Sequence, residues 1–411
     1  MKVYLRTFGC RANQYDSEQV RAMLQAGGHE LVDSPEHADA AVFNSCTVTA
    51  DAEADLRQSV RRASRLRPSL RSVVMGCAAA RDTGVLRALP GVERVVPGGD
   101  ARAVVESLGV DVVATARMQS GTRAVLRVQD GCDEHCTFCA TTQARGANRS
   151  RSVDSLCEEA THLAEYHAEI VITGIHIGTF GRDRGTTLGE LLQALVRRVP
   201  TVRFRLSSLE ATEVDGALRE LFCEPMRVAP YLHAPLQSGS DRVLKRMGRH
   251  WYTMREYGRA IEALVDRRPV FGLGADVIAG FPGETEADHQ ATLDAVEALP
   301  FTSLHIFPYS RRPGTPADRL SDQVPSATVK RRAAELRAVG ERKAGAYAAR
   351  RAGGLADVIV VTGAGDRRGL TGDYLSVGLA GGDIPRGTRF AARLESGKSG
   401  LEAVALCTGT S

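Results

Sequence analysis

The chain has 411 residues, of which 43% are hydrophobic and 25% are charged, and its formal net charge is +4. This length predicts two or three domains, and the composition excludes a disordered or fibrous protein. The sequence contains no apolar run of roughly 20 residues, and residues 1–10 do not resemble a secretion signal. We therefore expect a cytoplasmic protein without a membrane partner. The small positive charge permits a nucleic-acid partner but does not argue for one.

The first 80 residues alternate between strand-like and helix-like segments. The expected order is strand 2–8, helix 16–26, strand 40–44, helix 52–66 and strand 72–75. Such an alternation predicts a parallel sheet with crossover helices. Cys10, Cys46 and Cys77 each follow one of these strands, so the three thiols are expected at one edge of the sheet, where such folds bind ligands. The alternative is three buried apolar cysteines.

The cysteine content favours metal binding. The chain has nine cysteines, and an odd number argues against a disulfide framework. Residues 130–139 read DGCDEHCTFC, so Cys132, Cys136 and Cys139 have the spacing C-x3-C-x2-C. Three thiolates can hold a four-iron cluster and leave one iron open, and S-adenosylmethionine (SAM) can bind that iron through its amino and carboxylate groups. A structural zinc site is the alternative, but it normally has four ligands.

A second series of elements follows the triplet. Strand-like segments begin near residues 124, 170, 203, 231, 271 and 303, separated by helix-like segments such as 153–166, 188–199 and 254–265. Six β/α units in series predict an incomplete parallel barrel with its site at the C-terminal ends of the strands. The cysteine triplet follows the first of these strands, on the rim of the barrel.

The last segment differs in pattern. From about residue 355, short apolar runs alternate with Gly-rich turns, which predicts a small antiparallel β-barrel. Arg367, Arg368 and the helix-like segment 330–351 offer positive charge suited to phosphates, although a basic helix is more often a solvated surface.

The expected fold class is α/β with three parts. These are an N-terminal parallel-sheet βαβ domain (1–115), a central partial (β/α)6 barrel (116–348) and a small C-terminal antiparallel β-barrel (349–411).

Nine short segments, in order and spanning essentially the whole chain, resemble the methylthiotransferase family of radical-SAM enzymes. They read GCRANQYDSE, NSCTVT, GCAA, QDGCDEHCTFC, ARGANRSRS, ITGIHIGTFG, LQSGSDRVLKRMGR, GADVIAGFPGETEADH and FPYSRRPGTP. The C-terminal segment resembles the TRAM domain, an RNA-binding module, in GLTGDYLSV and GTRFAARLE.

The resemblance implies two [4Fe-4S] clusters and a SAM site. The triplet would hold the cluster that cleaves SAM, and the three N-terminal cysteines would hold an auxiliary cluster that supplies sulfur. The implied SAM-site residues are Phe138 beside the adenine, Thr173 and Gly174 at the amino group, Ser208 and Glu210 near the ribose, and Gly280, Pro282 and Gly283 in a tight loop after the fifth strand. Core packing for Phe138, and an ordinary turn for the glycines and proline, are the alternatives.

The implied reaction consumes two SAM molecules, one as methyl donor and one as the source of an adenosyl radical. Members of the family act on isopentenylated adenosine, on threonylcarbamoylated adenosine or on an aspartate of a ribosomal protein. NQYDSE, TVT and the RSR run at residues 149–151 are most similar to the threonylcarbamoyl branch. This implies C2 of N6-threonylcarbamoyladenosine at position 37, in the tRNA anticodon stem-loop, as the target. It also implies a low-potential electron donor similar to flavodoxin or ferredoxin.

Two segments depart from the family pattern, namely ATTQARG after Cys139 and AAA after Cys77. The first puts the shape of the loop beside SAM in doubt, though not the cluster ligands. Cys157, Cys223 and Cys407 match no ligand position and are expected to be packing or surface cysteines. Two other classes stay open: a radical-SAM enzyme whose N-terminal domain binds cobalamin or substrate, and a non-catalytic tRNA-binding protein.

Overall fold

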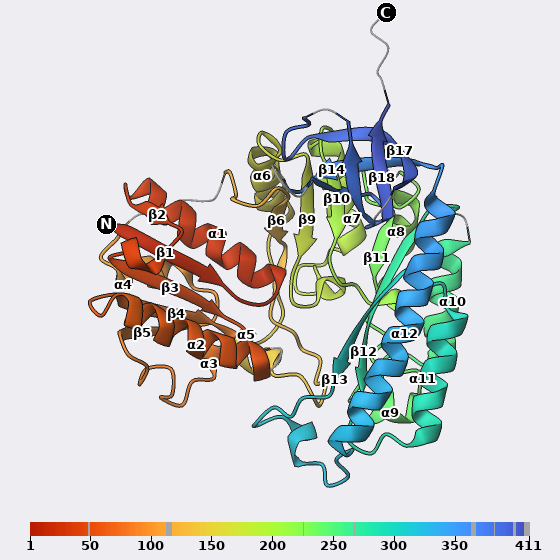
Figure 1. Cartoon of the computed structure of the whole chain (residues 1–411), viewed down its shortest axis with the longest axis horizontal. Helices are drawn as coiled ribbons and strands as arrows, with labels where there is room; N and C mark the ends of the chain where they lie inside the picture. The colour runs from red at the N-terminus through yellow and green to blue at the C-terminus, as the bar shows by residue number, and fades with distance from the viewer. Residues whose placement is uncertain are drawn as a thin grey trace, which may run out of the picture.

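The structure is a computed structural model with three parts: an N-terminal sheet, a central barrel and a C-terminal barrel (Figure 1). It describes residues 1–47, 50–111, 117–224, 226–266, 268–362, 367–381, 383–397 and 400–406. Val48 and Thr49 of the TVT segment and Cys407 lie outside the described residues. The expected fold class is confirmed.

The N-terminal sheet has five parallel strands in the order β2-β1-β3-β4-β5. The strands are β1 (Lys2–Thr7), β2 (Glu30–Val32), β3 (Ala40–Ser45), β4 (Arg71–Gly76) and β5 (Val92–Pro97). The helices are α1 (Arg11–Ala26), α2 (Ala50–Leu66), α3 (Cys77–Ala80) and α4 (Ala101–Ser107). Separate hydrophobic clusters lie on the two faces of the sheet, one including residues of α1 and α4 and the other residues of α2. The three predicted strands are confirmed, and β2 and β5 extend the sheet at its two edges.

The central barrel is open and consists of two three-stranded parallel sheets. Their strands are β6 (Ala124–Arg127), β9 (Glu169–Thr173) and β10 (Arg203–Leu206), then β11 (Tyr231–His233), β12 (Gly272–Ala279) and β13 (Ser303–Pro308). A parallel bridge between Ser208 and His233 joins the two sheets. The incomplete barrel predicted from the sequence is therefore confirmed, with its strands in chain order.

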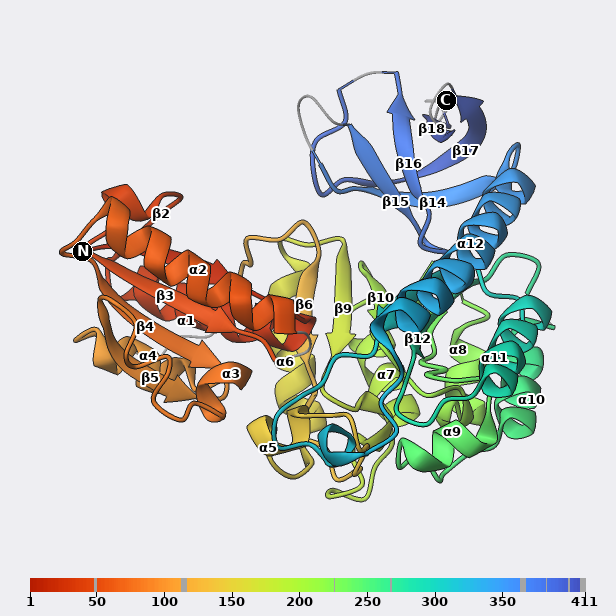
Figure 2. The ribbon, with the colours of Figure 1, turned by 60° about the horizontal axis from the view of Figure 1, so that its bottom comes forward.

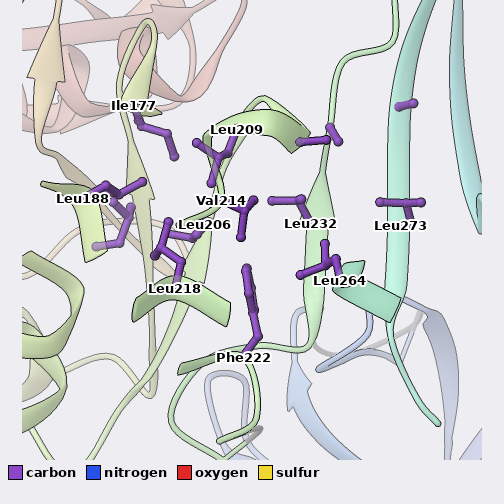
Figure 3. Close-up of a cluster of buried hydrophobic side chains, with 14 of the residues drawn as sticks. Ile177, Leu188, Leu206, Leu209, Val214, Leu218, Phe222, Leu232, Leu264 and Leu273 are labelled. Carbon is purple, nitrogen blue, oxygen red and sulfur yellow. The ribbon is translucent and has the colours of Figure 1, made fainter. Parts of the chain in front are cut away.

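Helices cover the outside of the central barrel. They are α6 (Val153–Ala164), α7 (Leu188–Arg198), α8 (Gly216–Leu221), α9 (Asp241–Arg246), α10 (Met254–Val265) and α11 (Glu286–Ala298). Figure 3 shows how strand residues such as Leu206, Leu232 and Leu273 pack with Leu218 and Leu264 of the helices in one buried cluster. The loop after β6 carries the short pair β7 (Gln129–Asp130) and β8 (Arg149–Ser150), and helix α5 (Thr141–Arg145).

The long helix α12 (Ser326–Arg351) packs along the central barrel and leads into the C-terminal barrel (Figure 2). The C-terminal barrel consists of β14 (Leu355–Val360), β15 (Arg368–Thr371), β16 (Ser376–Ala380), β17 (Arg389–Gly397) and β18 (Gly400–Ala405), closed in the order β14-β15-β16-β18-β17. The barrel was expected to be antiparallel, but β16 and β18 pair in parallel because the chain crosses from one to the other through β17.

Several arginines of α12, which were considered as phosphate contacts, form ion pairs within the chain. Arg331, Arg332, Arg342 and Arg351 each form an ion pair with an acidic side chain of the same chain. Arg332 and Arg351 are buried in their ion pairs and do not face a phosphate backbone, whereas Arg331 and Arg342 are largely exposed. Within the described part of the chain, no helix has the length and apolar character needed to cross a membrane.

Candidate active site

The three N-terminal cysteines lie together because β1, β3 and β4 are adjacent and parallel. Cys10 caps the N-terminus of α1, Cys46 follows β3, and Cys77 is the first residue of α3. The thiols of Cys10 and Cys77 each lie 3.9 Å from Oδ1 of Asn13. Gly9 has a φ of +93°, and a Cβ at this position would lie 2.5 Å from the Cys46 sulfur. A side chain at residue 9 would therefore push the strand ends apart.

Arg145 of α5 connects this cysteine group to the central barrel. Its Nε lies 3.4 Å from the Cys77 sulfur, and its Nη2 donates hydrogen bonds of 2.7 Å to Asn13 and to Asp16. Burial raises the pKa of the Cys77 thiol to about 11, although the Arg145 guanidinium opposes this shift. A cation beside a buried thiol is the arrangement that stabilises the thiolate needed for metal ligation.

Each cysteine of the triplet also has a donor beside it. His176 Nδ1 lies 3.7 Å from the Cys132 sulfur, Arg249 Nη1 lies 3.9 Å from the Cys136 sulfur, and the backbone N–H of Thr141 donates to the Cys139 sulfur at 3.3 Å. Burial raises the pKa of Cys136 to about 12, with Arg249 opposing the shift.

The pKa of the His176 imidazole lies above its ordinary value of 6.5. Burial alone would lower its pKa, but the contacts with Cys132 and Glu213 raise it to about 10. The triplet therefore has two cationic side chains next to it, His176 and Arg249, in addition to the backbone donor.

A cavity of about 670 Å³ brings the two cysteine groups to one place. All three cysteines of the triplet line it, and so does Cys10 from the N-terminal group, whereas Cys46 and Cys77 are buried behind. Five of the residues expected at SAM also line it: Phe138, Thr173, Gly174, Ser208 and Glu210.

The other three expected residues lie elsewhere. Gly280, Pro282 and Gly283 form the turn after β12, with positive φ values at both glycines. The N–H of Gly283 donates to the carbonyl of Asp322, and a Cβ at Gly280 would meet Val329 of α12. These three residues are not among the described residues that line the cavity.

Glu210 shows how the cavity fits a polar ligand. Its side chain is buried, and one carboxylate oxygen pairs with Arg249. Among the described residues, none donates a hydrogen bond to the other oxygen, Oε2. A buried carboxylate oxygen without a donor is costly unless a ligand supplies one. Two groups of three thiols with cations beside them, together with this free acceptor of a residue lining the cavity, fit two clusters and SAM in chemical character.

The sequence did not single out several residues of the cavity. His176, Arg249 and Tyr374 line the cavity, and Arg145 lies behind it at Cys77. All four are inside segments quoted for the family resemblance, but their neighbours come from distant parts of the chain. His233, Asp276 and His305, on adjacent strands β11, β12 and β13, form a further polar group. Asp276 Oδ1 lies 2.9 Å from His233 Nε2 and 3.2 Å from His305 Nδ1, and the two imidazole rings are stacked.

Comparison with protein families agrees with this architecture. Residues 126–296 match the Radical SAM superfamily, and residues 2–98 match an uncharacterized protein family, UPF0004. A solved structure with a similar fold is the radical S-adenosylmethionine methyltransferase TsrM from Kitasatospora setae. It has a TM-score of 0.58 and 15% identity, and 77% of each chain is covered. The fold and the cysteine-lined cavity define a radical-SAM enzyme, a class that uses SAM and [4Fe-4S] clusters.

Curated proteins with similar sequences show to which family of radical-SAM enzymes the chain belongs. The threonylcarbamoyladenosine tRNA methylthiotransferase MtaB of Bacillus subtilis (strain 168) is 36% identical over 84% of this chain and 82% of its own length. The protein of the same name from Aquifex aeolicus (strain VF5) is 32% identical over 92% and 96%. A tRNA-2-methylthio-N(6)-dimethylallyladenosine synthase from Jannaschia sp. (strain CCS1) is 35% identical over 82% and 79%. The chain belongs to the radical-SAM tRNA methylthiotransferase family.

Proposed function

We propose that the chain adds a methylthio group to C2 of N6-threonylcarbamoyladenosine at position 37 of tRNA, in the anticodon stem-loop. The structural observation that carries this proposal is that residues of both cysteine groups, Cys10 and the triplet Cys132, Cys136 and Cys139, line one cavity. A methylthiotransferase needs a sulfur source and a SAM-cleaving centre near one substrate. The names of the curated relatives support the choice of nucleoside.

In this proposal the triplet holds the cluster that binds SAM, and Cys10, Cys46 and Cys77 hold the auxiliary cluster. When bound, the clusters and SAM supply the one-electron chemistry and the methylthio group. The chain itself positions these groups. Arg145 and Arg249 stabilise the thiolates of Cys77 and Cys136, and Glu210, with its unpartnered oxygen Oε2, would help to hold SAM. A flavodoxin- or ferredoxin-like protein is the proposed electron donor, and the cytoplasm is the proposed site of action.

The runner-up substrate is dimethylallyladenosine (isopentenyladenosine) in tRNA, because relatives of that name share comparable identity with this chain. A ribosomal-protein aspartate is the third alternative from the same family. Both leave the enzyme class unchanged and differ in the group that enters the cavity.

Mass spectrometry of tRNA nucleosides tests the substrate. The chain is expressed in bacteria that lack their own methylthiotransferases but still make both precursor nucleosides. We expect 2-methylthio-N6-threonylcarbamoyladenosine to accumulate. A dimethylallyl product in its place would make the runner-up correct, and the absence of any methylthio nucleoside would contradict a tRNA substrate.

A matched pair of cysteine variants tests the role of the N-terminal group. Cys10→Ala removes a thiol at the cavity, whereas Cys157→Ala removes a half-buried thiol on α6 that belongs to neither group. We expect Cys10→Ala to leave the unthiolated precursor and Cys157→Ala to behave as the wild type. The purified chain should hold about eight irons, as two four-iron clusters require. A cobalt signal with about four irons would instead favour a cobalamin enzyme.

A further inference from the structure

Tyr374 stands out because its backbone is in a conformation that side chains rarely adopt. It lies in the turn between β15 and β16 of the C-terminal barrel, with a φ of +73°. A non-glycine residue in the left-handed region is strained, and such residues persist where the surrounding structure holds them. The contacts of this turn therefore show how the strained conformation is held and where it places the side chain.

The turn is held firmly against the central barrel and α12. Asp373 accepts hydrogen bonds of 2.7 Å from Arg351 and from Tyr347. Arg205 of β10 donates to the carbonyl oxygens of Thr371 and Gly372 at 3.1 and 3.0 Å. The turn lies so close to β12 that a Cβ at residue 272, a glycine, would lie 2.2 Å from the carbonyl oxygen of Asp373.

This anchoring places the Tyr374 ring on the wall of the cavity. The ring stacks on that of Tyr231 from β11, with centroids 4.4 Å apart and planes 19° apart, and both residues line the cavity. The guanidinium carbon of Arg205 lies 5.0 Å from the centre of the Tyr374 ring. Burial would raise the pKa of Tyr374, but the nearby Arg11 and Arg123 lower it. The cavity thus has an aromatic wall in positively charged surroundings, partly contributed by a barrel that is distant in sequence.

We propose that Tyr374, backed by the buried ring of Tyr231, binds substrate and is a stacking surface for the purine of the target nucleoside. The inference rests on the proposed function. Enzymes that act on a base take it out of its stack and hold it between aromatic or apolar side chains. Aromatic side chains also bind the splayed bases of RNA loops. The C-terminal barrel then completes the reaction cavity, in addition to any contact with the RNA backbone.

Substitution at residue 374 separates binding from folding, because glycine removes the ring and also relieves the strain. The probe is an anticodon stem-loop RNA carrying the threonylcarbamoyl nucleoside, titrated with the cluster-loaded enzyme. We expect Tyr374→Gly to weaken the Kd by roughly ten-fold or more, as loss of a base–aromatic stack does. Its melting temperature should not fall below that of the wild type. Tyr374→Phe keeps the ring and should bind within about two-fold of the wild type. Tyr166→Ala, at an exposed tyrosine after α6, is the surface control.

A spectroscopic readout reports the stacking itself. The same stem-loop with 2-aminopurine at the target position should fluoresce more brightly when bound to Tyr374→Gly than when bound to the wild type, because stacking quenches this base. Equal affinity and equal fluorescence for wild type and Tyr374→Gly would overturn the inference and leave the proposed function standing. Failure of the wild-type enzyme to bind either stem-loop would overturn both.

Discussion

Arg249 and Glu210 form a buried ion pair at the centre of the candidate site. Both side chains are almost fully buried, and Arg249 also approaches the Cys136 sulfur. Because a buried carboxylate without its cation is strongly destabilising, we expect Arg249→Met to lower the free energy of unfolding by about 3–5 kcal/mol. Urea denaturation followed by circular dichroism measures this loss.

A double variant distinguishes the loss of the pair from the loss of packing. Arg249→Met combined with Glu210→Gln removes both charges, so it should recover part of the stability lost in the single variant. Arg255→Met, at an exposed arginine on α10, should be close to neutral. Equal losses for the single and double variants would mean that the charge of Glu210 is not what makes Arg249 necessary.

The triad of His233, Asp276 and His305 predicts a pH dependence. The contact with Asp276 raises the pKa of His305. Burial would raise the pKa of Asp276, but the imidazoles of His233 and His305 hold it below its usual range. The stability that His305 contributes to the folded state is fully present below 6.5, the pKa of an unfolded histidine. It is lost as the pH rises through the raised pKa of the folded state. The stability that Asp276 contributes is fully present above 3.8, the pKa of an unfolded aspartate, and is lost as the pH falls below it.

The stability difference between wild type and His305→Gln should therefore be largest between about pH 4 and 6.5 and smaller at pH 9. The His305 side chain is 57% exposed, so the effect should not exceed about 1 kcal/mol. Thermal unfolding at several pH values checks this, with the exposed His250→Gln as the control. A difference that grows above pH 7 would contradict the assignment.

The sequence predicted those site residues whose signal is local. The C-x3-C-x2-C spacing predicts that Cys132, Cys136 and Cys139 form one group. The positions of Cys10, Cys46 and Cys77 after predicted parallel strands indicated that these three would lie together. Arg145 and Tyr374 could not be found in this way. Arg145 lies 68 positions from Cys77 and 132 from Asn13, and Tyr374 lies more than 100 positions from Tyr231, so nothing near them in the sequence indicates those contacts.

At the scale of the elements, replacing two glycines by alanine should change the stability of the protein in opposite directions. A Cβ at Gly272, the first residue of β12, would clash with the backbone oxygen of Asp373, which cannot move without displacing the turn that holds Tyr374. Gly345 is exposed in the middle of α12, with no atom within 4 Å of the Cβ position. We expect Gly272→Ala to destabilise the protein and Gly345→Ala to stabilise it by about 0.5–1 kcal/mol. Thermal unfolding compares the two, and unchanged stability in Gly272→Ala would mean that the C-terminal barrel is not seated as described.

The elements that the sequence predicted well are the buried ones. Strand β3 is entirely buried and begins with four apolar residues (AAVF), whereas β2 has three partly exposed residues and β5 has mainly exposed or half-buried ones. Edge strands bury little apolar surface, so their composition resembles that of loops. The parallel pairing of β16 and β18 was missed for another reason, because strand order in a closed barrel depends on the route of the chain.

For the whole molecule, the contact between the N-terminal sheet and the central barrel depends on a buried carboxylate. Asp16 is 1% exposed and forms ion pairs with Arg127 and Arg145, both from the central part of the chain. Asp16→Leu would leave the buried guanidinium of Arg145 and the partly buried one of Arg127 without this partner, so we expect the two parts to separate. Small-angle X-ray scattering should then show a larger radius of gyration than for the wild type or for Asp33→Leu, at an exposed aspartate. An unchanged radius would mean that apolar contacts suffice to dock the sheet.

The wall of the cavity combines Cys10 with Tyr374, and this has a consequence for biosynthesis. All six cysteines of the two groups lie within the first 139 residues, whereas Tyr374 comes more than 200 residues later. At roughly 5–20 residues per second, a ribosome needs on the order of 10–50 s to make the intervening segment. During that interval the nascent chain already has its metal-binding cysteines but lacks the aromatic residue that we propose to hold the base. Metal loading and substrate binding would then be separated in time by translation itself.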